Sequence, residues 1–223
     1  DIEFNDCKLL ANHSPVGGAI FYVKDPSLTA TVLLDHCRLG ANYSTAAHGG
    51  ACYFHTDAGP MTVSVVSTTF DAINQVPTPY YGGGLFTDGP ETHLFLTNSR
   101  FEGNVATRSG AVWADSIAEF RVVNTDFLEN YAREGGGAIW YRDGDYDHFT
   151  ITGSLFQGNT CPDNGGALWI NNRANIDIST TEFSSNRADS GGAIAINDSS
   201  TEIRLLTDNF FSNVAHKVGG ALY

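Results

Sequence analysis

Gly136-Gly137-Ala138-Ile139-Trp140 decides the fold, because copies of this stretch recur along the whole chain. In each copy small residues precede an apolar residue, which an aromatic residue follows in most copies. A unit of this size, with copies 26 to 33 residues apart, is typical of a solenoid, a propeller or an array. The third position of the copies is held by Ala19, Ala51, Gly84, Ala111, Ala138, Ala167, Ala193 and Ala221.

Each unit also contains short runs in which apolar and polar residues alternate, such as Ile176-Asp177-Ile178. Alternation with period two, interrupted by residues that favour turns, predicts strands, and no stretch has the period of a helix. Two or three short strands in each unit of about 28 residues predict one coil of a parallel β-helix. We therefore expect an all-β fold over residues 1–223, a single-domain solenoid of about seven to eight coils within a longer repeat array.

Equal positions of successive coils form columns, and four columns are apolar enough to line the interior. The cysteines set the expected alignment of the first two coils, since Cys7 and Cys37 stand where we place the phenylalanine column. The four columns are Ala30, Val63, Leu94, Phe120, Phe149, Ile176 and Ile203; Ile2, Val32, Val65, Leu96, Val122, Ile151, Ile178 and Leu205; Cys7, Cys37, Phe70, Phe101, Phe127, Phe156, Phe183 and Phe210; and Ile20, Cys52, Leu85, Val112, Ile139, Leu168, Ile194 and Leu222.

One polar residue, asparagine, recurs in every coil shortly after the phenylalanine position. Its side-chain amide can donate to one neighbouring coil and accept from the other, and asparagine tolerates a tight turn. Because every coil carries it, we predict a structural ladder rather than a single binding site. Its members are Asn12, Asn42, Asn74, Asn104, Asn130, Asn159, Asn186 and Asn213.

Phe-x-x-Asn followed by Gly-Gly-Ala and an aliphatic residue, as in Phe156–Asn159 and Gly165–Leu168, resembles the repeats of the chlamydial-type polymorphic outer membrane proteins. The resemblance covers essentially the whole chain. It implies a right-handed parallel β-helix exposed on a cell surface, as in the passenger regions of adhesins. The first two coils depart from the pattern, with Cys7 and Cys37 in place of phenylalanine and asparagine five residues later.

The charge balance limits the classes of partner. The chain carries 25 acidic residues against 12 basic ones, a net charge of −13, which argues against nucleic acid and anionic membrane surfaces. No apolar run reaches the roughly 18 residues that a membrane span needs, so we expect no direct membrane insertion. The resemblance implies a secreted or cell-surface location.

All three tryptophans, Trp113, Trp140 and Trp169, stand in consecutive coils directly after the aliphatic column. Neighbours in a strand point to opposite faces, so one of the two columns faces outward. We expect the aromatic column to be an exposed ladder that suits sugar rings or a partner's backbone. The alternative is that the aromatic rings point inward and the aliphatic column is covered. With Phe86 and Tyr53, the tryptophans are the candidate ligand- or partner-binding residues.

One acidic loop, Asp143-Gly144-Asp145-Tyr146-Asp147, has the alternating carboxylates that suit Ca²⁺. It lacks the remaining positions of an EF-hand loop, so a solvated turn is the preferred interpretation. We therefore expect no cofactor, with Ca²⁺ bound by Asp143, Asp145 and Asp147 as the alternative.

Two further features concern covalent chemistry. Cys7 and Cys37 lie in adjacent coils, at a spacing that a disulfide accepts, whereas the alternative is a set of buried thiols used as small apolar residues. Asn197-Asp198-Ser199 is an acceptor pattern for glycosylation, which makes Asn197 a candidate modified residue.

Since the same residues recur in every coil, we predict a non-enzymatic extracellular β-helix, a structural or adhesive segment of a cell-surface adhesin or fibre. Its expected partners are like β-helix chains, packed end-to-end or laterally. One alternative is a glycan-binding surface on the aromatic column. The other is a polysaccharide lyase or hydrolase, which needs clustered carboxylates, and Asp115 and Asp143 in neighbouring coils are the nearest to that arrangement.

Overall fold

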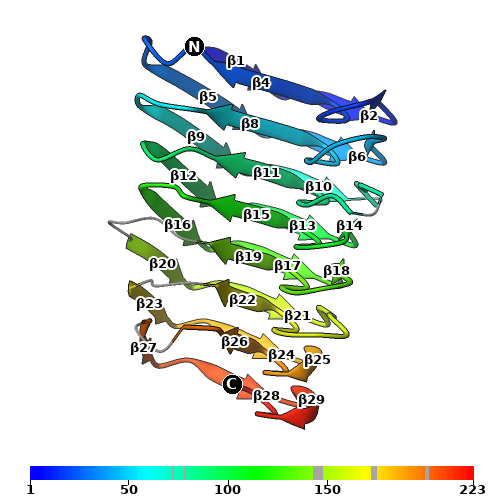
Figure 1. Ribbon diagram of the computed structural model, residues 1–223, viewed down its shortest axis with the longest axis vertical. Coiled ribbons are helices and arrows are strands. Elements are labelled where there is room, and N and C mark those ends of the chain that lie inside the picture. Colours follow the sequence, from blue (N-terminus) through cyan, green and yellow to red (C-terminus); the bar gives the residue numbers. More distant parts are fainter. Residues whose placement is uncertain (72, 78, 143–147, 172–174, 199–200) are drawn as a thin grey trace.

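The computed structural model describes residues 1–71, 73–77, 79–142, 148–171, 175–198 and 201–223. The chain winds as a parallel β-helix whose coils stack from the N-terminal end to the C-terminal end (Figure 1). Each coil adds a strand to a sheet, and every strand pairs in parallel with its equivalents in the neighbouring coils. Within the described residues all regular elements are strands, so none is a helix that could cross a membrane.

Three long sheets form the walls of the solenoid. The first contains β1 (Ile2–Asn5), β5 (Ala30–Asp35), β9 (Met61–Val66), β12 (Thr92–Thr97), β16 (Glu119–Val123), β20 (His148–Thr152), β23 (Asn175–Ser179) and β27 (Glu202–Leu206). The second contains β2 (Lys8–Leu10), β6 (Arg38–Gly40), β10 (Thr69–Asp71), β13 (Arg100–Glu102), β17 (Asp126–Leu128), β21 (Leu155–Gln157), β24 (Glu182–Ser184) and β28 (Asn209–Phe211).

The third sheet carries the Gly-Gly-Ala repeats. It contains β4 (Ile20–Lys24), β8 (Cys52–Thr56), β11 (Leu85–Asp88), β15 (Val112–Asp115), β19 (Ile139–Arg142), β22 (Leu168–Asn171) and β26 (Ile194–Ile196). Three short pairs close the remaining corner: β3 (His13–Ser14) with β7 (Tyr43–Ser44), β14 (Val105–Ala106) with β18 (Tyr131–Ala132), and β25 (Arg187–Ser190) with β29 (Val214–Val218).

The interior is filled by columns of like residues, because strand alternation turns every second side chain inward. The phenylalanine column stacks ring on ring, with centroids 4.5 to 5.2 Å apart from Phe70 to Phe210. The predicted aliphatic column from Ile20 to Leu222 is in register throughout. These columns belong to one continuous core along the rod.

The alignment expected for the first two coils is wrong by two residues. Leu9 and Leu39, not Cys7 and Cys37, continue the phenylalanine column into these coils. A shift by two residues keeps every side chain on the same face, so the apolar pattern alone does not reveal it. The Phe-x-x-Asn spacing is therefore kept as Leu-x-x-Asn in both coils. The same correction pairs Val32 with Val63, and the predicted neighbour of Val63, Ala30, lies beside Met61.

The asparagine column forms the expected ladder. From Asn12 to Asn186, each asparagine donates its Nδ2 to the Oδ1 of the next one at 2.9 to 3.0 Å. All of them except Asn74 also donate their backbone N–H to the same Oδ1, at 3.0 to 3.1 Å. In the inner coils Nδ2 also donates to a carbonyl in the preceding coil, such as Phe101 O for Asn130. The amide is thereby satisfied although six of these residues are fully buried.

A second polar column, which the sequence pattern did not predict, runs through the turn between the first and second sheets. Each hydroxyl accepts the backbone N–H of the equivalent residue one coil earlier and donates to a carbonyl two residues before it. Cys7 and Cys37 begin this column, and their thiols donate to the corresponding carbonyls. Its remaining members are Thr68, Ser99, Thr125, Ser154, Thr181 and, with a carboxylate, Asp208.

Candidate functional site: the outer face of the third sheet

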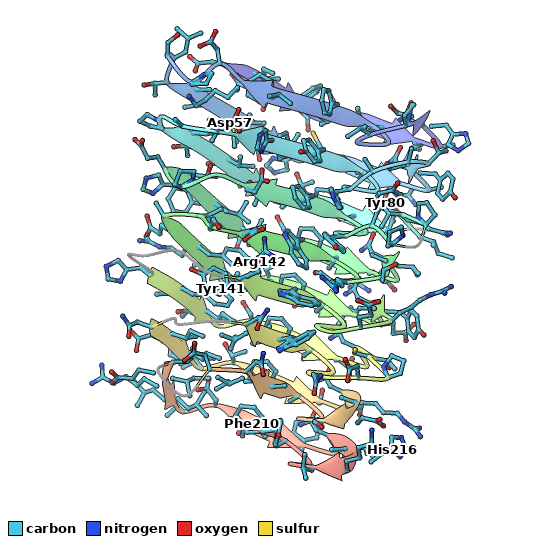
Figure 2. All side chains as sticks on the ribbon, in the orientation of Figure 1. Asp57, Tyr80, Tyr141, Arg142, Phe210 and His216 are labelled. Carbon is cyan, nitrogen blue, oxygen red and sulfur yellow. The ribbon has the colours of Figure 1, made fainter. Side chains whose placement is uncertain are left out.

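The outer face of the third sheet gathers the residues that bear chemistry. Its aromatic row holds Phe21, Tyr53, Phe86, Trp113, Trp140 and Trp169, one from each strand between β4 and β22. Two residues further along the same strands, a polar row holds His55, Asp88, Asp115, Arg142 and Asn171. Figure 2 labels Arg142 and the inward-pointing Tyr141 beside it, near the middle of the coil stack.

The aromatic row lies outside the main core, as alternation predicts, but the expected open ladder is wrong. Phe86, Trp113 and Trp140 form a separate buried cluster, with exposures of 4%, 1% and 2%. Tyr53 and Trp169 are half-buried, and Phe21 is 56% exposed. The row is therefore covered over its middle and accessible at its N-terminal end.

Residues in the turns that lead into the third sheet supply the cover. The Tyr81 ring stacks on Trp113 with centroids 4.5 Å apart, and His48 stacks on both Tyr81 and Phe86 at 4.5 and 4.7 Å. Gly135 lies so close to Trp169 that a Cβ there would meet the indole at 1.5 Å. These contacts come from turns that strand patterns in the sequence do not place.

The rings of the row also stack on one another, which occupies their faces. Tyr53 and Phe86 are nearly parallel with centroids 5.0 Å apart, and Trp140 lies 4.0 Å from Trp169. A ring with neighbours on both faces cannot also stack on a sugar ring. Within this row, Phe21 is the ring with the greatest exposure.

Arginines pack against the tryptophans from outside. The Arg108 guanidinium lies 5.0 Å from the Trp140 ring and that of Arg142 lies 5.7 Å from Trp113, within the range of cation–π contacts. In the described part of the chain, the Nε1 atoms of Trp113 and Trp140 are buried without a hydrogen-bond partner. Stacking and burial, rather than hydrogen bonds, therefore hold these indoles.

Charged side chains of the polar row pair with side chains of opposite charge in neighbouring coils. His55 Nδ1 lies 2.5 Å from Asp88 Oδ1, and its Nε2 lies 3.2 Å from Asp57 Oδ1. Arg142 grips Asp115 with two contacts, from Nε at 2.9 Å and from its terminal nitrogen. The pairs of His55 with Asp88 and of Arg142 with Asp115 join adjacent coils, so these side chains link each coil to its neighbour. The repeat pattern alone did not predict these pairs. The signal that could have found them is position, because each member stands two residues after the aromatic residue of its strand.

The predicted approach of Asp115 to Asp143 cannot be placed, since Asp143, Asp145 and Asp147 lie outside the described residues. The carboxylate that neighbours Asp115 in the structure is Asp88 on β11. Both carboxylates are engaged by a cation or an imidazole. Among the described residues, no cluster of histidine, cysteine or carboxylate side chains could hold a metal ion.

The remaining candidates lie elsewhere. All four cysteines are free thiols, so the Cys7–Cys37 disulfide is not formed, although both residues occupy the same position of adjacent coils. Cys161 is fully buried, and this burial raises the pKa of its thiol to about 12. Asn197 is exposed, and its Nδ2 donates to Asn171 Oδ1 at 2.9 Å.

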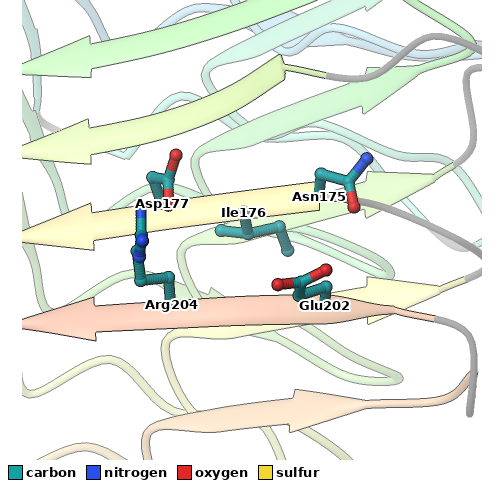
Figure 3. Close-up of a pocket in the computed structure, with 5 residues that line it drawn as sticks. All are labelled: Asn175, Ile176, Asp177, Glu202 and Arg204. Carbon is teal, nitrogen blue, oxygen red and sulfur yellow. The ribbon is translucent and has the colours of Figure 1, made fainter.

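A separate hollow of about 240 Å³ lies between β23 and β27 in the first sheet (Figure 3). Asn175, Asp177, Glu202 and Arg204 line it with polar groups, above Ile176, and Arg204 extends toward Asp177. It contains no aromatic ring and most of its polar side chains are exposed. It is a shallow polar depression rather than an enclosed pocket.

His48 should make the fold sensitive to acid. Burial between the rings lowers the pKa of His48 from 6.5 to about 4, so its unfolded form binds a proton more readily than its folded form. The contribution of neutral His48 to the free energy of unfolding is therefore complete above pH 6.5 and falls as the pH drops toward 4. Allowing for partial exposure, the loss at about pH 5 is about 1–2 kcal/mol. Urea unfolding at about pH 7.5 and about pH 5 should show this loss in the native chain and a smaller loss in His48→Phe. An unchanged difference in the variant would contradict the assignment.

His55 should act in the opposite sense. Burial lowers its pKa, but the carboxylates of Asp88 and Asp57 more than offset this, so the pKa is raised above 6.5. The contribution is therefore complete below pH 6.5 and is lost as the pH rises through the folded value. For a partly exposed pair we expect less than about 1 kcal/mol. Between about pH 6 and about pH 8.5, His55→Gln should lose less stability than the native chain. His216→Gln, a substitution outside this row, should lose as much stability as the native chain over the same range.

Comparison with known families supports the repeat assignment. The model of the Chlamydia polymorphic membrane protein repeat matches residues 153–174, which include Phe156, Asn159 and Gly165-Gly166-Ala167. No curated protein and no solved structure was found to match the chain. A repeat of this type implies association with a surface or an outer membrane. The chain is therefore a parallel β-helix in which residues 153–174 match the Chlamydia polymorphic membrane protein repeat.

Proposed function

We propose that this chain is a non-enzymatic structural or adhesive segment of an extracellular surface protein, a rod that packs with like β-helices. The observation that carries the proposal is the asparagine ladder, which runs unbroken from Asn12 to Asn213. Because each coil hydrogen-bonds to the next in the same way, the polar groups serve the stack rather than one local site.

The chemistry of the third sheet agrees with a structural role. An enzyme of the polysaccharide-cleaving kind needs carboxylates that can exchange protons with a substrate. Here Asp88 and Asp115 face His55 and Arg142, and the aromatic row beside them is covered over its middle. The same pairs act between coils, which is what a rigid rod requires.

Surface labelling tests the location. Antibodies against this chain should bind intact cells that carry the protein as well as permeabilised cells, and brief proteolysis of intact cells should remove the signal. The absence of enzyme activity is tested by incubation with a panel of neutral and acidic polysaccharides. Labelling restricted to permeabilised cells, or a release of new chain ends that Asp88→Asn abolishes, would overturn the proposal.

A glycan contact is the second candidate, and the exposed Phe21 ring favours it. Phe21 is 56% exposed and its other face stacks on Tyr53 with centroids 5.3 Å apart. A rigid ring with an open face suits a sugar ring. Affinity electrophoresis through polysaccharide gels should show a shift that Phe21→Ala removes, and Trp140→Ala, which alters a covered ring, serves as the comparison. A shift that Phe21→Ala leaves intact would contradict this candidate.

A further inference from the structure

The outer face of the second sheet has a charge order that neither the core nor the third sheet uses. Its first outer row consists of the residues directly before each member of the phenylalanine column. Its second outer row consists of the residues directly after each member. The first outer row is Lys8, Arg38, Thr69, Arg100, Asp126, Leu155, Glu182 and Asn209. The second outer row is Leu10, Gly40, Asp71, Glu102, Leu128, Gln157, Ser184 and Phe211.

The first outer row is divided by sign. Its cations lie in the first half of the rod, on β2, β6 and β13, and its carboxylates lie in the second half, on β17 and β24. The side chains of Arg38 and Arg100 are 50% and 44% exposed. Their Nε atoms bond Asp71 and Glu102, while the planar guanidinium carries further donors. A face with this order is complementary to an inverted copy of itself.

We propose that two copies of this chain pack through the second sheet as an antiparallel, two-fold symmetric pair. The two-fold axis runs along the strand direction between β13 and β17, so β2 faces β28 and β6 faces β24 of the partner copy. This inference rests on the proposed packing of like rods and specifies which face they use.

Two opposed pairs of the first outer row match in charge. The pairing brings Arg38 opposite Glu182 and Arg100 opposite Asp126, each twice because of the symmetry. No position of either row faces a like charge. The carboxylate that meets an apolar residue, that of Glu102 opposite Leu128, keeps its bond to the Arg100 side chain.

The ends of the face match as well. The exposed apolar residues Leu10 and Phe211, 43% and 50% exposed, face each other at both ends of the pair. Between the ends, Gly40 and Ser184 are buried beneath their own neighbours and add no contact. Apolar contact at the ends and charge pairs between them fix one register of the two rods.

The first sheet does not offer the same match. An antiparallel pair through its outer face would place Asp1 opposite Glu202 at both ends, and this repulsion would offset the attraction between Glu3 and Arg204 beside it. The third sheet is already covered over its middle by Tyr81 and His48. The second sheet is therefore the face that a second copy fits.

The size of the face sets the strength of the pair. Eight strands at about 4.8 Å span about 38 Å, and three-residue strands are about 10 Å wide. Such a pair buries on the order of 800 Å² in total, below the roughly 1,200 Å² of stable complexes. The pair is therefore weak and, because its specific contacts are ionic, sensitive to salt.

Sedimentation velocity of the chain at about 1 mM should show dimers at about 20 mM salt and fewer at about 500 mM salt. Arg38→Glu alone and Glu182→Arg alone should each weaken the dimer by at least about tenfold, since two attractive pairs become repulsive. An equimolar mixture of the two variants should recover dimer above the level of either variant alone. In the heterodimer, position 38 of each chain faces position 182 of the other with the opposite charge, so both contacts are attractive. Arg100→Glu with Asp126→Arg provides a second mixture if a first variant folds poorly.

A chain that stays monomeric at low salt, a dimer indifferent to Arg38→Glu, or a mixture that associates no better than its separate components would overturn the inference. Circular dichroism and unfolding midpoints of each variant show whether the fold is retained. Cell-surface labelling does not depend on this dimer, so failure of the pairing and failure of the proposed location are distinguished.

Discussion

Replacement of Asn130 by alanine is expected to lower the free energy of unfolding by about 3–5 kcal/mol, because it leaves several buried polar groups without a hydrogen-bond partner. Asn130 Oδ1 accepts from both the backbone N and the Nδ2 of Asn104, each at 3.0 Å. Its Nδ2 donates to Phe101 O and to Asn159 Oδ1, also at 3.0 Å. All of these partners belong to buried residues, so water cannot replace the lost amide.

Asn12→Ala is the matched control for this change. Asn12 belongs to the same ladder and donates to Asn42 at 3.0 Å, but it is exposed to solvent. Water can satisfy the groups that it leaves, and we expect a loss of less than about 1 kcal/mol. Urea unfolding followed by circular dichroism measures both variants, with unchanged slopes as evidence that the folded state is retained. A loss for Asn130→Ala as small as that for Asn12→Ala would show that the ladder is not a main source of stability.

The asparagine ladder could be predicted from the sequence because recurrence alone identifies it. A residue that occupies one position of every coil must meet its equivalents, and the amide has the donors and acceptor to connect them. The interior aliphatic column was predictable for the same reason. The hydroxyl column was missed because serine, threonine and cysteine alternate in it, so no single residue type marks the position.

The register of the first two coils shows where periodicity stops being informative. Leu39 and Cys37 lie two residues apart, so either could face the core with the same alternation. The structure resolves the choice through hydrogen bonds: Cys37 N donates to Thr68 Oγ1, which fixes its place in the turn column. A comparison of the Leu-x-x-Asn and Phe-x-x-Asn spacings would have given the correct alignment.

The outer face of the third sheet depends on contacts that a strand pattern does not contain. Alternation places Trp113 outward, but whether it is exposed depends on Tyr81, which reaches it from a turn that leads into the third sheet. The pairing of His55 with Asp88 depends on the register between coils whose lengths differ. Burial of this row is therefore a property of coil-to-coil packing rather than of one repeat.

Gly137→Ala is expected to be at least as damaging as loss of the ladder, with about 3 kcal/mol or more of lost stability. A Cβ on Gly137 would lie 2.0 Å from Gly166 O and 2.7 Å from Thr160 N, both backbone atoms of the next coil. The second glycine of the repeat makes the same approach, at 2.0 to 2.4 Å, in every coil from Gly18 to Gly192. Backbone atoms cannot rotate away, so the clash must separate the coils that Gly137 N and Gly165 O connect at 3.1 Å.

Gly220→Ala is the control, because the same repeat position there has open space, with Asn213 O at 3.8 Å as its nearest neighbour. We expect Gly220→Ala to change the free energy of unfolding by less than about 1 kcal/mol. Urea unfolding compares the two variants, and hydrogen exchange should show faster exchange in the strands on either side of Gly137, β15, β19 and β22, than in the native chain. If Gly137→Ala is as stable as Gly220→Ala, the close approach of the glycine column is not what fixes the Gly-Gly-Ala sequence. If it is much less stable, then contact between coils is what requires glycine at this position of each repeat, since a side chain there keeps its neighbours from stacking.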